Sequence, residues 1–355
     1  MRIAVLGVGL IGGSVGLAAR RFVPGAEVVG HGRDRTRLDR ARELGAIDTA
    51  AGTLEEALEG ADVCFACAPV GALPGQVSAA LAAAGEDCVV TDVGSTKRQL
   101  VAALDDPRFV GGHPIAGAET SGVDHARAEL FQGAVWYLTP TERTGGLLYE
   151  RLHRLLKQIG ARPVAVDPAT HDRLVAVFSH LPHVLANVLV RHAAGPLLEE
   201  GEALRQVGPS FRDASRVAGA NTTMWADVYR SNREAVAAEA RRFARSLEEV
   251  AGLLEADGDV AAWNDDAREA RRLLLEADLT GQPVHELRLT VPNRPGIVAS
   301  VALALGRAGV NIVDLTLAPA ADMLTGAMTL WIAGDGEAAR ATELIGELGF
   351  PVAEL

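Results

Sequence analysis

The sequence Ile3-Ala-Val-Leu-Gly7-Val-Gly9-Leu-Ile-Gly12 joins an apolar strand pattern to the start of a helical pattern. Its glycines follow G-x-G-x-x-G, in which Gly7 permits a tight turn, Gly9 admits a close backbone approach and Gly12 lets the helix pack closely. The helix that follows offers unpaired backbone N–H groups to a bound anion. We therefore expect a dinucleotide-binding turn formed by Gly7, Gly9, Leu10, Ile11 and Gly12.

The residue about 20 positions after such a turn normally contacts the ribose 2′ position of the cofactor. Gly32 stands there, within Gly30-His31-Gly32-Arg33-Asp34, so this position lacks the carboxylate that binds a 2′-hydroxyl. Arg33 and Arg35 stand near it as cations suited to a 2′-phosphate, and the pattern leans toward NADP. Asp34 could still accept a ribose hydroxyl, so NAD stays open.

Residues 1–166 alternate short apolar runs with amphipathic stretches, which is typical of a parallel sheet covered by helices. We expect a doubly wound, Rossmann-type α/β domain. Its expected strands are Arg2–Leu6, Glu27–His31, Asp62–Ala68, Cys88–Thr91 and Ala134–Leu138, and its expected helices include Thr53–Glu59 and Gly71–Ala83.

Residues 167–280 are rich in Ala, Leu, Arg and Glu with helical periodicity, which predicts an all-helical second domain. Its long amphipathic segments, such as Asn232–Glu255, carry more apolar surface than a small bundle can hide. We therefore expect the chain to form a homodimer through these helices.

A break at Gly281-Gln-Pro283 precedes a third unit over residues 284–355, whose pattern predicts the ferredoxin-like order βαββαβ. With Asn293-Arg-Pro-Gly-Ile297 at its first turn, this unit resembles an ACT domain, a module that commonly binds amino acids at domain interfaces. The resemblance implies an aromatic amino-acid effector, and an assembly domain without a ligand stays open. The expected strands are Val284–Val291, Val310–Ala318, Gly326–Ile332 and a short final one, and the expected helices are Gly296–Ala308 and Gly336–Leu348.

The formal net charge of −12 disfavours nucleic acid as a partner, because phosphate binding depends on basic residues. The three cysteines, Cys64, Cys67 and Cys88, are too few for a disulfide framework and indicate a reducing compartment. The N-terminal glycines disfavour a signal peptide, and we expect no apolar run long enough to span a bilayer. A cytoplasmic protein without a membrane partner is expected.

Four separate segments agree with one family in order and spacing. They are Gly9-Leu-Ile-Gly-Gly-Ser14, Thr91-Asp-Val-Gly-Ser-Thr-Lys97, Gly112-His-Pro-Ile-Ala-Gly117 and Ser179-His-Leu-Pro-His183, the last followed by Phe211-Arg-Asp-Ala-Ser-Arg216. Over about residues 1–277, the chain resembles the prephenate and arogenate dehydrogenases. This resemblance implies oxidation with decarboxylation by an NAD(P)-dependent enzyme, with prephenate or arogenate as substrate and no metal.

The resemblance also assigns roles to particular side chains. It implies that His113 bonds the substrate's ring hydroxyl with help from Ser95, and that Arg216 binds a substrate carboxylate. It places Ser179, His183 and Glu119 along the site. Without the resemblance, a loop histidine such as His113 is more often a surface or capping residue than a base.

Helical spacing adds two expectations about the second domain. If residues 175–189 are helical, Ser179 and His183 share one face while His180 turns away, which favours His183 as the site residue. Arg212 and Arg216 stand four apart and could present two cations to a dianionic substrate. A solvated helix face that includes Asp213 is the alternative for this pair.

Two other functions stay open on the sequence. One is a different hydride-transfer enzyme, such as a hydroxy-acid dehydrogenase, which would keep the glycine turn but leave the agreement of the four segments unexplained. The other is a non-enzymatic sensor that binds a dinucleotide and an amino acid.

Overall fold

The computed structural model describes residues 1–117, 120–199, 208–278, 283–292, 294, 297–310, 312–320 and 324–354. They form two compact units. The first comprises Met1–Ala203 and Ser215–Ala244, and the second comprises Leu204–Ala214 and Arg245–Leu355.

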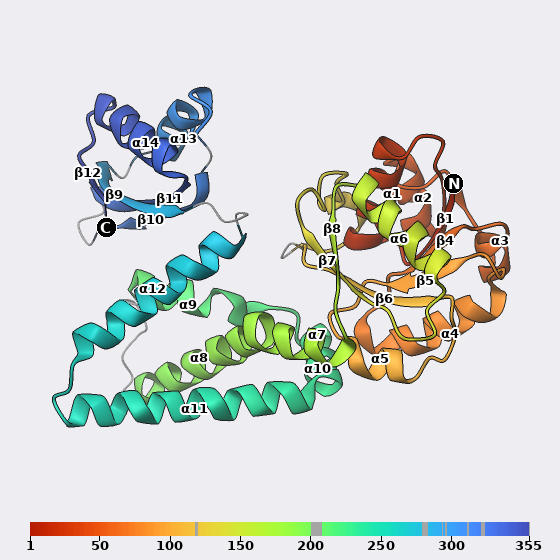
Figure 1. Ribbon diagram of the computed structural model, residues 1–355, viewed down its shortest axis with the longest axis horizontal. Coiled ribbons are helices and arrows are strands. Elements are labelled where there is room, and N and C mark those ends of the chain that lie inside the picture. Colours follow the sequence, from red (N-terminus) through yellow and green to blue (C-terminus); the bar gives the residue numbers. More distant parts are fainter. Residues whose placement is uncertain are drawn as a thin grey trace. The chain divides into compact units, whose positions relative to one another are not determined.

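The first unit is built on an eight-stranded sheet with the order β3-β2-β1-β4-β5-β6-β7-β8. Neighbouring strands are parallel, except that β6 and β7 are antiparallel. The chain leaves β1 toward one edge and returns to build the other, so the turn after β1 lies at the switch point where such sheets bind ligands (Figure 1). The strands are β1 (Arg2–Leu6), β2 (Glu27–His31), β3 (Thr49–Ala50), β4 (Val63–Ala66), β5 (Val89–Asp92), β6 (Phe109–Pro114), β7 (Val135–Thr139) and β8 (Arg162–Ala165).

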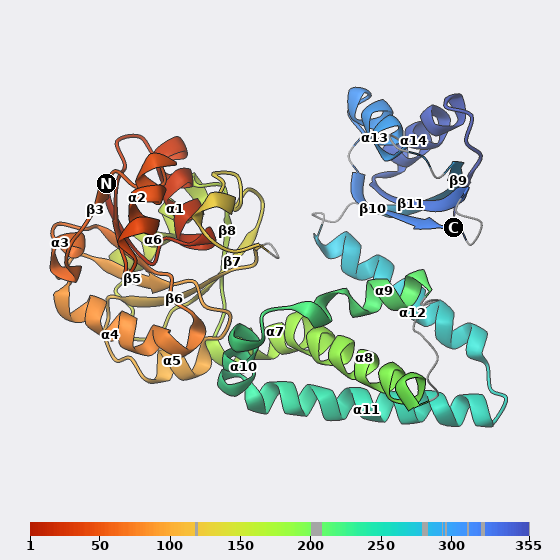
Figure 2. The same cartoon turned by 180° about the vertical axis from the view of Figure 1, so that it is seen from behind.

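Helices cover both faces of this sheet because successive side chains of each strand point to opposite faces (Figure 2). Ile3 and Val5 of β1 pack on the face covered by α1 (Leu10–Phe22), α2 (Arg35–Glu43) and α6 (Gly146–Gln158). Ala4 and Leu6 pack on the other face, under α3 (Leu54–Leu58), α4 (Leu73–Ala83) and α5 (Arg98–Ala102). The predicted doubly wound, Rossmann-type fold is confirmed, with a mixed rather than wholly parallel sheet.

A run of helices completes the first unit. It consists of α7 (Pro168–Val175), the π-helical turn η3 (Ala176–His180), α8 (Leu181–Glu199), the 3₁₀ turn η4 (Arg216–Gly219), α10 (Thr222–Ser231) and the beginning of α11 (Arg233–Glu255). The expectation of a regular α-helix over residues 175–189 is wrong at η3, where a wider turn accommodates one extra residue. The predicted helical region 167–280 is divided between the two units, because α7 packs against α5 and β7 of the sheet domain.

The second unit contains a four-stranded antiparallel sheet with the order β10-β11-β9-β12. Helices α13 and α14 lie on one face of it, over a core that includes Leu287, Leu305 and Leu330 (Figure 1). This is the predicted βαββαβ order. The elements are α9 (Pro209–Ser215), α12 (Val260–Asp278), β9 (Val284–Pro292), α13 (Ile297–Arg307), β10 (Ile312–Pro319), β11 (Thr325–Ala333), α14 (Asp335–Glu347) and β12 (Val352–Glu354).

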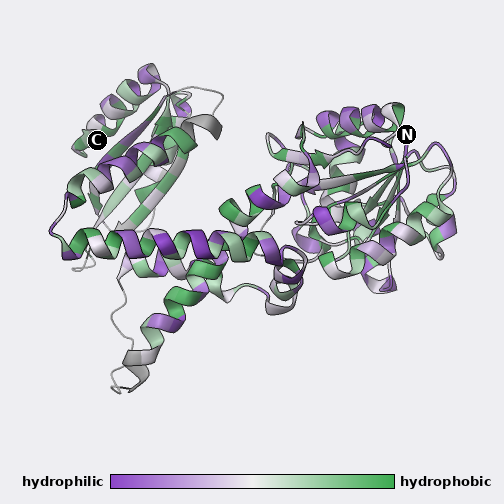
Figure 3. Cartoon of the chain, turned by 60° about the horizontal axis from the view of Figure 1, so that its bottom comes forward, coloured by the Kyte–Doolittle hydropathy of each residue, from purple (hydrophilic) through white to green (hydrophobic). Residues whose placement is uncertain are grey.

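The run Pro168–Gly195 is long and apolar enough, by length and composition, to cross a membrane, although no such run was expected. Within its most apolar window, 33% of the residues are buried. The same run carries His171, Asp172 and His180, which are buried against the rest of the first unit. Hydrophobic and hydrophilic residues alternate along the long helices (Figure 3). Exposed apolar side chains on these helices include Val188, Leu247 and Leu254.

Candidate active site

The glycine turn between β1 and α1 has the geometry that its sequence predicts. Gly7 has a φ of +99°, which favours glycine, and a Cβ on Gly12 would lie 2.3 Å from the Gly7 carbonyl oxygen. A Cβ on Gly9 would instead project into open space, where a ligand can approach the backbone. The first turn of α1 has neither a capping side chain nor an acidic residue, so its N–H groups suit a pyrophosphate.

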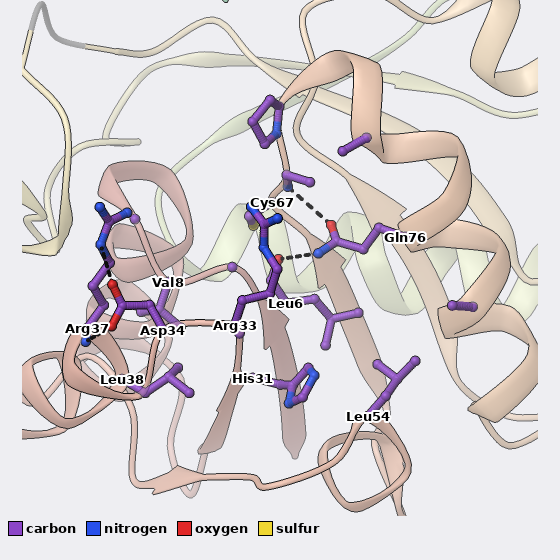
Figure 4. Close-up of a pocket in the computed structure, with 17 residues that line it drawn as sticks. Leu6, Val8, His31, Arg33, Asp34, Arg37, Leu38, Leu54, Cys67 and Gln76 are labelled. Carbon is purple, nitrogen blue, oxygen red and sulfur yellow. Dashed lines mark hydrogen bonds and ion pairs between the residues drawn. The ribbon is translucent and has the colours of Figure 1, made fainter.

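A cavity of about 570 Å³ opens beside this turn, between the ends of β1, β2 and β4. Gln76 supports its wall, because its side chain donates to the Leu6 carbonyl (3.2 Å) and accepts from the Ala68 amide (3.1 Å; Figure 4). Of the predicted cofactor residues, Gly7, Gly9 and Arg33 line the cavity, whereas Leu10, Ile11 and Gly12 contribute the first turn of α1. The volume, the bare helix end and the small Gly9 fit a dinucleotide.

Charge at the far end of the cavity is carried by Arg33, Asp34 and Arg37. The Asp34 carboxylate caps α2 by accepting from the Arg37 amide at 3.2 Å, and its second oxygen lies 3.1 Å from Arg37 Nε. Both oxygens of Asp34 therefore contact Arg37, although Asp34 was the alternative to Gly32 as the acceptor of a ribose 2′-hydroxyl. Among the described residues, no carboxylate forms an ion pair with the exposed Arg33.

His113, at the end of β6, begins a buried chain of hydrogen bonds. Its Nδ1 lies 2.9 Å from Nε2 of His171 in α7. The His171 Nδ1 in turn lies 2.9 Å from the Asp172 carboxylate, and both residues are at most 2% exposed. That carboxylate also accepts from the backbone N–H groups of Lys97 (2.7 Å) and Arg98 (3.0 Å), which begin α5. Three donors thus fix Asp172, and Asp172 fixes His171.

A second buried carboxylate, Asp92, lies at the end of β5, next to the Ser95 loop. It accepts from the amide of Gly94 (2.8 Å) in that loop and from the amide of Gly112 (3.0 Å) in β6, and it pairs with the Lys97 ammonium. Lys97 is fully buried, and this burial lowers its pKa while Asp92 opposes the shift. Asp92 therefore links the two segments that carry Ser95 and His113.

The electrostatics around His113 favour its neutral form. Burial, His171 and the Lys97 ammonium together hold the pKa of His113 well below its usual value, and His180 adds to the effect. Among the described residues, the hydrogen bond recorded for His113 is the one at Nδ1, and a neutral imidazole can accept a proton at its other nitrogen.

The helical part of the unit contributes an aromatic cluster around His183. The His183 ring stacks on Trp225 with centroids 3.7 Å apart, and its Nδ1 is hydrogen-bonded to the Tyr229 hydroxyl. His180 packs edge-on against the same Trp225 at 5.9 Å and lies 3.2 Å from the Asn232 amide nitrogen. The expectation that His180 turns away from this site is wrong, because the π turn at 176–180 rotates it inward and leaves Ser179 exposed.

The remaining predicted residues differ in placement. Ser95 is half-buried in the loop above Asp92, and the structure records no hydrogen bond between it and His113 in the described chain. Arg216 is exposed at the start of η4, which packs against α8. Arg212 belongs to the second unit, and α9 ends at Ser215, so the two arginines do not share one regular α-helix as expected. Glu119 lies outside the described residues.

Sequence reasoning missed most of the groups that hold His113. Lys97 and Asp92 both lie in the segment Thr91–Lys97, but the sequence suggested no role for either and did not predict that they form an ion pair. His171 and Asp172 precede the Ser179 segment, and only their position in the fold reveals them. A histidine followed by an aspartate near the start of a helix, just after the last strand of the sheet, was the available signal.

Two family models match successive parts of the chain. Residues 15–165 match the family described as prephenate dehydrogenase, nucleotide-binding domain. Residues 167–269 match the family described as prephenate dehydrogenase, dimerization domain.

Individual relatives give the same result. A prephenate dehydrogenase from Bacillus subtilis is 28% identical over 97% of this chain and 95% of its own length. A cyclohexadienyl dehydrogenase from Zymomonas mobilis is 32% identical, with 78% of this chain and 96% of the relative covered.

Two solved structures are similar in three dimensions. Prephenate dehydrogenase from Aquifex aeolicus, in complex with hydroxyphenyl propionate and NAD⁺, has a TM-score of 0.71 and 29% identity over 77% of this chain and 98% of its own. Arogenate dehydrogenase from Synechocystis has a TM-score of 0.66 and 28% identity, with 79% of this chain and all of the other (100%) covered.

Proposed function

Because the chain belongs to the prephenate dehydrogenase family, we propose that it oxidises and decarboxylates prephenate to 4-hydroxyphenylpyruvate in tyrosine biosynthesis. The observation that carries the proposal is His113, a neutral imidazole held by two buried residues at the edge of a dinucleotide-binding sheet. A sensor that binds the same ligands without chemistry has no need for such a group.

The reaction balances with the groups present. His113 takes the proton of the ring hydroxyl, the carbon that bears this hydroxyl loses a hydride, and the ring carboxylate leaves as carbon dioxide. The electron pair of the broken carbon–carbon bond completes an aromatic ring, which drives the reaction, and the proton returns from His113 to the phenolate oxygen. A bound nicotinamide supplies the hydride acceptor. A positioned base of this kind contributes roughly 10²–10⁴ in rate.

We assign the substrate's side-chain carboxylate to Arg216, because guanidinium groups bind carboxylates in a bidentate manner. The His183–Trp225–Tyr229 cluster supplies an aromatic wall and polar groups on the same helical layer. Ser95 assists His113, and Ser179 and Glu119 complete the proposed substrate contacts.

The cofactor proposal includes both nicotinamide dinucleotides. The Aquifex relative was solved with NAD⁺, which supports NAD⁺ for this chain. The sequence lean toward NADP rests on Arg33, which lines the cavity while Asp34 is engaged with Arg37. We expect Arg33→Ser to raise KM for NADP⁺ about tenfold and to leave KM for NAD⁺ within twofold. Equal effects on both cofactors would remove Arg33 from 2′-phosphate recognition.

Arogenate is the alternative substrate, and relatives with both related activities are similar to this chain. Arogenate differs from prephenate by an ammonium in place of a keto group on the side chain. A steady-state comparison of both substrates with both cofactors tests the whole proposal. Reduction of either cofactor on addition of prephenate supports it, whereas turnover of hydroxy acids alone would indicate a different dehydrogenase.

We propose that the exposed apolar side chains of α8 and α11 pair two copies of the chain in the cytoplasm. The match of residues 167–269 to a dimerization domain supports this reading over a membrane span of Pro168–Gly195. A single species of monomer mass at micromolar concentration in analytical ultracentrifugation would contradict the proposed homodimer.

We propose three domains, which are a sheet domain over 1–166, a helical domain over 167–280 and a third over 284–355. The third is proposed to be an ACT-like regulatory domain that binds an aromatic amino acid. Its βαββαβ order supports the proposal. Most of the turn that suggested the ligand site, including Asn293, lies outside the described residues. Activity that is insensitive to tyrosine and phenylalanine, in the full chain, would leave the domain a structural role only.

A further inference from the structure

The hydrogen bonds from His113 to His171 and from His171 to Asp172 constrain which ring nitrogens carry protons, in addition to the orientation of the rings. An ionised carboxylate has no proton to donate, so Asp172 accepts from His171 Nδ1–H. A neutral His171 with its proton on Nδ1 has a bare Nε2, and this atom must accept from His113 Nδ1–H at 2.9 Å. His113 then carries its proton on Nδ1 and leaves Nε2 bare.

We propose that His171 and Asp172 are positioning residues that hold His113 in the tautomer whose Nε2 can receive the substrate's hydroxyl proton. This inference rests on the proposed function for its role, although the tautomer itself can be observed without substrate. The opposite tautomer, with hydrogen on Nε2, would present a donor to the hydroxyl and could not act as a base.

The residues around His171 hold its ring in this orientation. It is fully buried, and Tyr137 of β7 meets its ring edge-on at 5.5 Å. Asp172 is immobilised by the N–H groups of Lys97 and Arg98, and its own backbone carbonyl accepts from the Asn232 side chain at 2.8 Å. The orientation of His113 is therefore set by the start of α5 and by Asn232, between α10 and α11, both remote in sequence.

The same chain can also share the positive charge that develops during turnover. When Nε2 takes the substrate's proton, the proton on Nδ1 of His113 can move to Nε2 of His171. The cation then lies next to the Asp172 carboxylate, and reversal of both transfers returns the proton through His113. The titratable and charged groups that face His113 and His171 are Lys97 and Asp92 from the β5–α5 segment, Asp172 from α7, His180 from η3 and Tyr137 from β7.

The direct test is ¹⁵N NMR of the full chain labelled at histidine, with the His113 signals assigned from the spectrum of His113→Asn. We expect the wild-type protein to show Nδ1 of His113 protonated and Nε2 bare at neutral pH. In Asp172→Asn, the introduced amide presents a donor where His171 has donated, so we expect His113 to shift toward the Nε2-protonated form. A wild-type His113 protonated on Nε2 would overturn the proposal, whatever the enzyme's activity.

Kinetics provide the second arm. We expect His171→Leu to lower kcat about 10–100-fold with KM for substrate and the Kd for cofactor changed less than threefold. His171→Gln should lose less, because its amide oxygen can still accept from His113 Nδ1–H. Wild-type kcat in a folded His171→Leu, or equal losses in both variants, would contradict the role.

Asp167→Asn is the matched control on the same helix. Asp167 caps α7 through the amides of Ala169 (3.1 Å) and Thr170 (3.0 Å) but contacts no site residue. Because asparagine caps a helix about as well as aspartate, this change removes only the charge, and it should move neither the NMR tautomer nor kcat. If the wild-type protein reduces no cofactor with either substrate while His113 shows the expected tautomer, the proposed function fails and the positioning inference stands.

Discussion

At the carboxyl edge of the N-terminal sheet, Asp92, Lys97 and Asp172 are charged side chains that are at most 2% exposed. In the described part of the C-terminal unit, the residues with comparable burial are apolar, such as Leu287 of β9, Leu305 of α13 and Leu330 of β11. Among the described residues, every buried polar or charged side chain belongs to the first unit.

The difference follows from the cost of burying charge. Removing an ion from water costs several kcal/mol even when it is paired, and an apolar side chain in the same place is often at least as stable. The first unit carries this cost around His113, the base that we propose. In the described part of the C-terminal unit, the buried core is apolar and carries no such cost.

The largest expected effect is on catalysis at the charged edge. We expect His113→Asn to lower kcat roughly 10²–10⁴-fold, because it removes the base, while the Kd for cofactor changes little. Steady-state kinetics and a cofactor titration measure the two. His125→Asn, an exposed histidine of the same unit, is the control and should keep wild-type kcat. Unchanged turnover in His113→Asn would remove this residue from the mechanism.

Breaking the buried ion pair should mainly change stability. We expect Lys97→Met to lower the free energy of unfolding of the first unit by about 3–5 kcal/mol, because Asp92 would remain buried without its cation. Urea denaturation followed by circular dichroism measures this. Arg98→Ala removes an exposed pair with Glu234 and should cost less than about 1 kcal/mol. Similar losses in both variants would mean that burial does not distinguish the two pairs.

The apolar core of the C-terminal unit offers the converse test. Leu305 is fully buried, so Leu305→Ala should destabilise that unit by about 2–5 kcal/mol. Basal turnover without an effector should be unchanged, since no site residue lies in that sheet. Differential scanning calorimetry and initial rates report the two effects. A parallel loss of kcat in folded protein would show that the C-terminal core supports the chemistry directly.

Buried histidines should make the first unit sensitive to acid. Burial lowers the pKa of His180 to about 4, while His171 and His183 act in the same direction and Asp172 opposes them. Between pH 6.5 and 4 the unfolded chain binds a proton at this residue that the folded chain excludes, so stability falls as pH falls. The full effect is about 3 kcal/mol. Denaturation midpoints across this range should vary less with pH in His180→Asn, and an identical dependence in both proteins would contradict the assignment.

The smallest effect is expected for surface charge on the second unit. Arg268 pairs with Asp265 at 3.3 Å with both side chains 64% exposed. Arg268→Ala should change the free energy of unfolding by less than about 0.5 kcal/mol, since exposed pairs are screened by water and salt. A loss of 2 kcal/mol or more, roughly the scale of a buried charged hydrogen bond, would show that α12 depends on this charge.

The sequence predicted features that arise from local rules. The turn Gly7–Gly12 needs small residues next to its own neighbours, and the alternation along Arg2–Leu6 needs only the two faces of a strand. The site was harder to predict from the sequence, because His113 was identified from a family resemblance and its partners His171 and Asp172 come from another segment. Such contacts depend on how α7 packs on α5, which no periodicity encodes. The π turn was missed for a related reason, since residues 175–189 have an ordinary helical pattern.

That π turn, η3, has a consequence for changes in chain length. Removing one residue from 176–180 would restore a regular helix and rotate α8 by about 100° relative to α7, while α10, which carries Trp225, packs against η1 (Val70–Ala72) of the sheet domain. His171 and Asp172 would keep their positions, whereas His183 would swing off the face of Trp225. A single deletion there would move His183 relative to His171, Asp172 and the rest of the aromatic cluster while leaving the helix intact. We therefore expect related chains to conserve the length of this segment more strictly than its residue types.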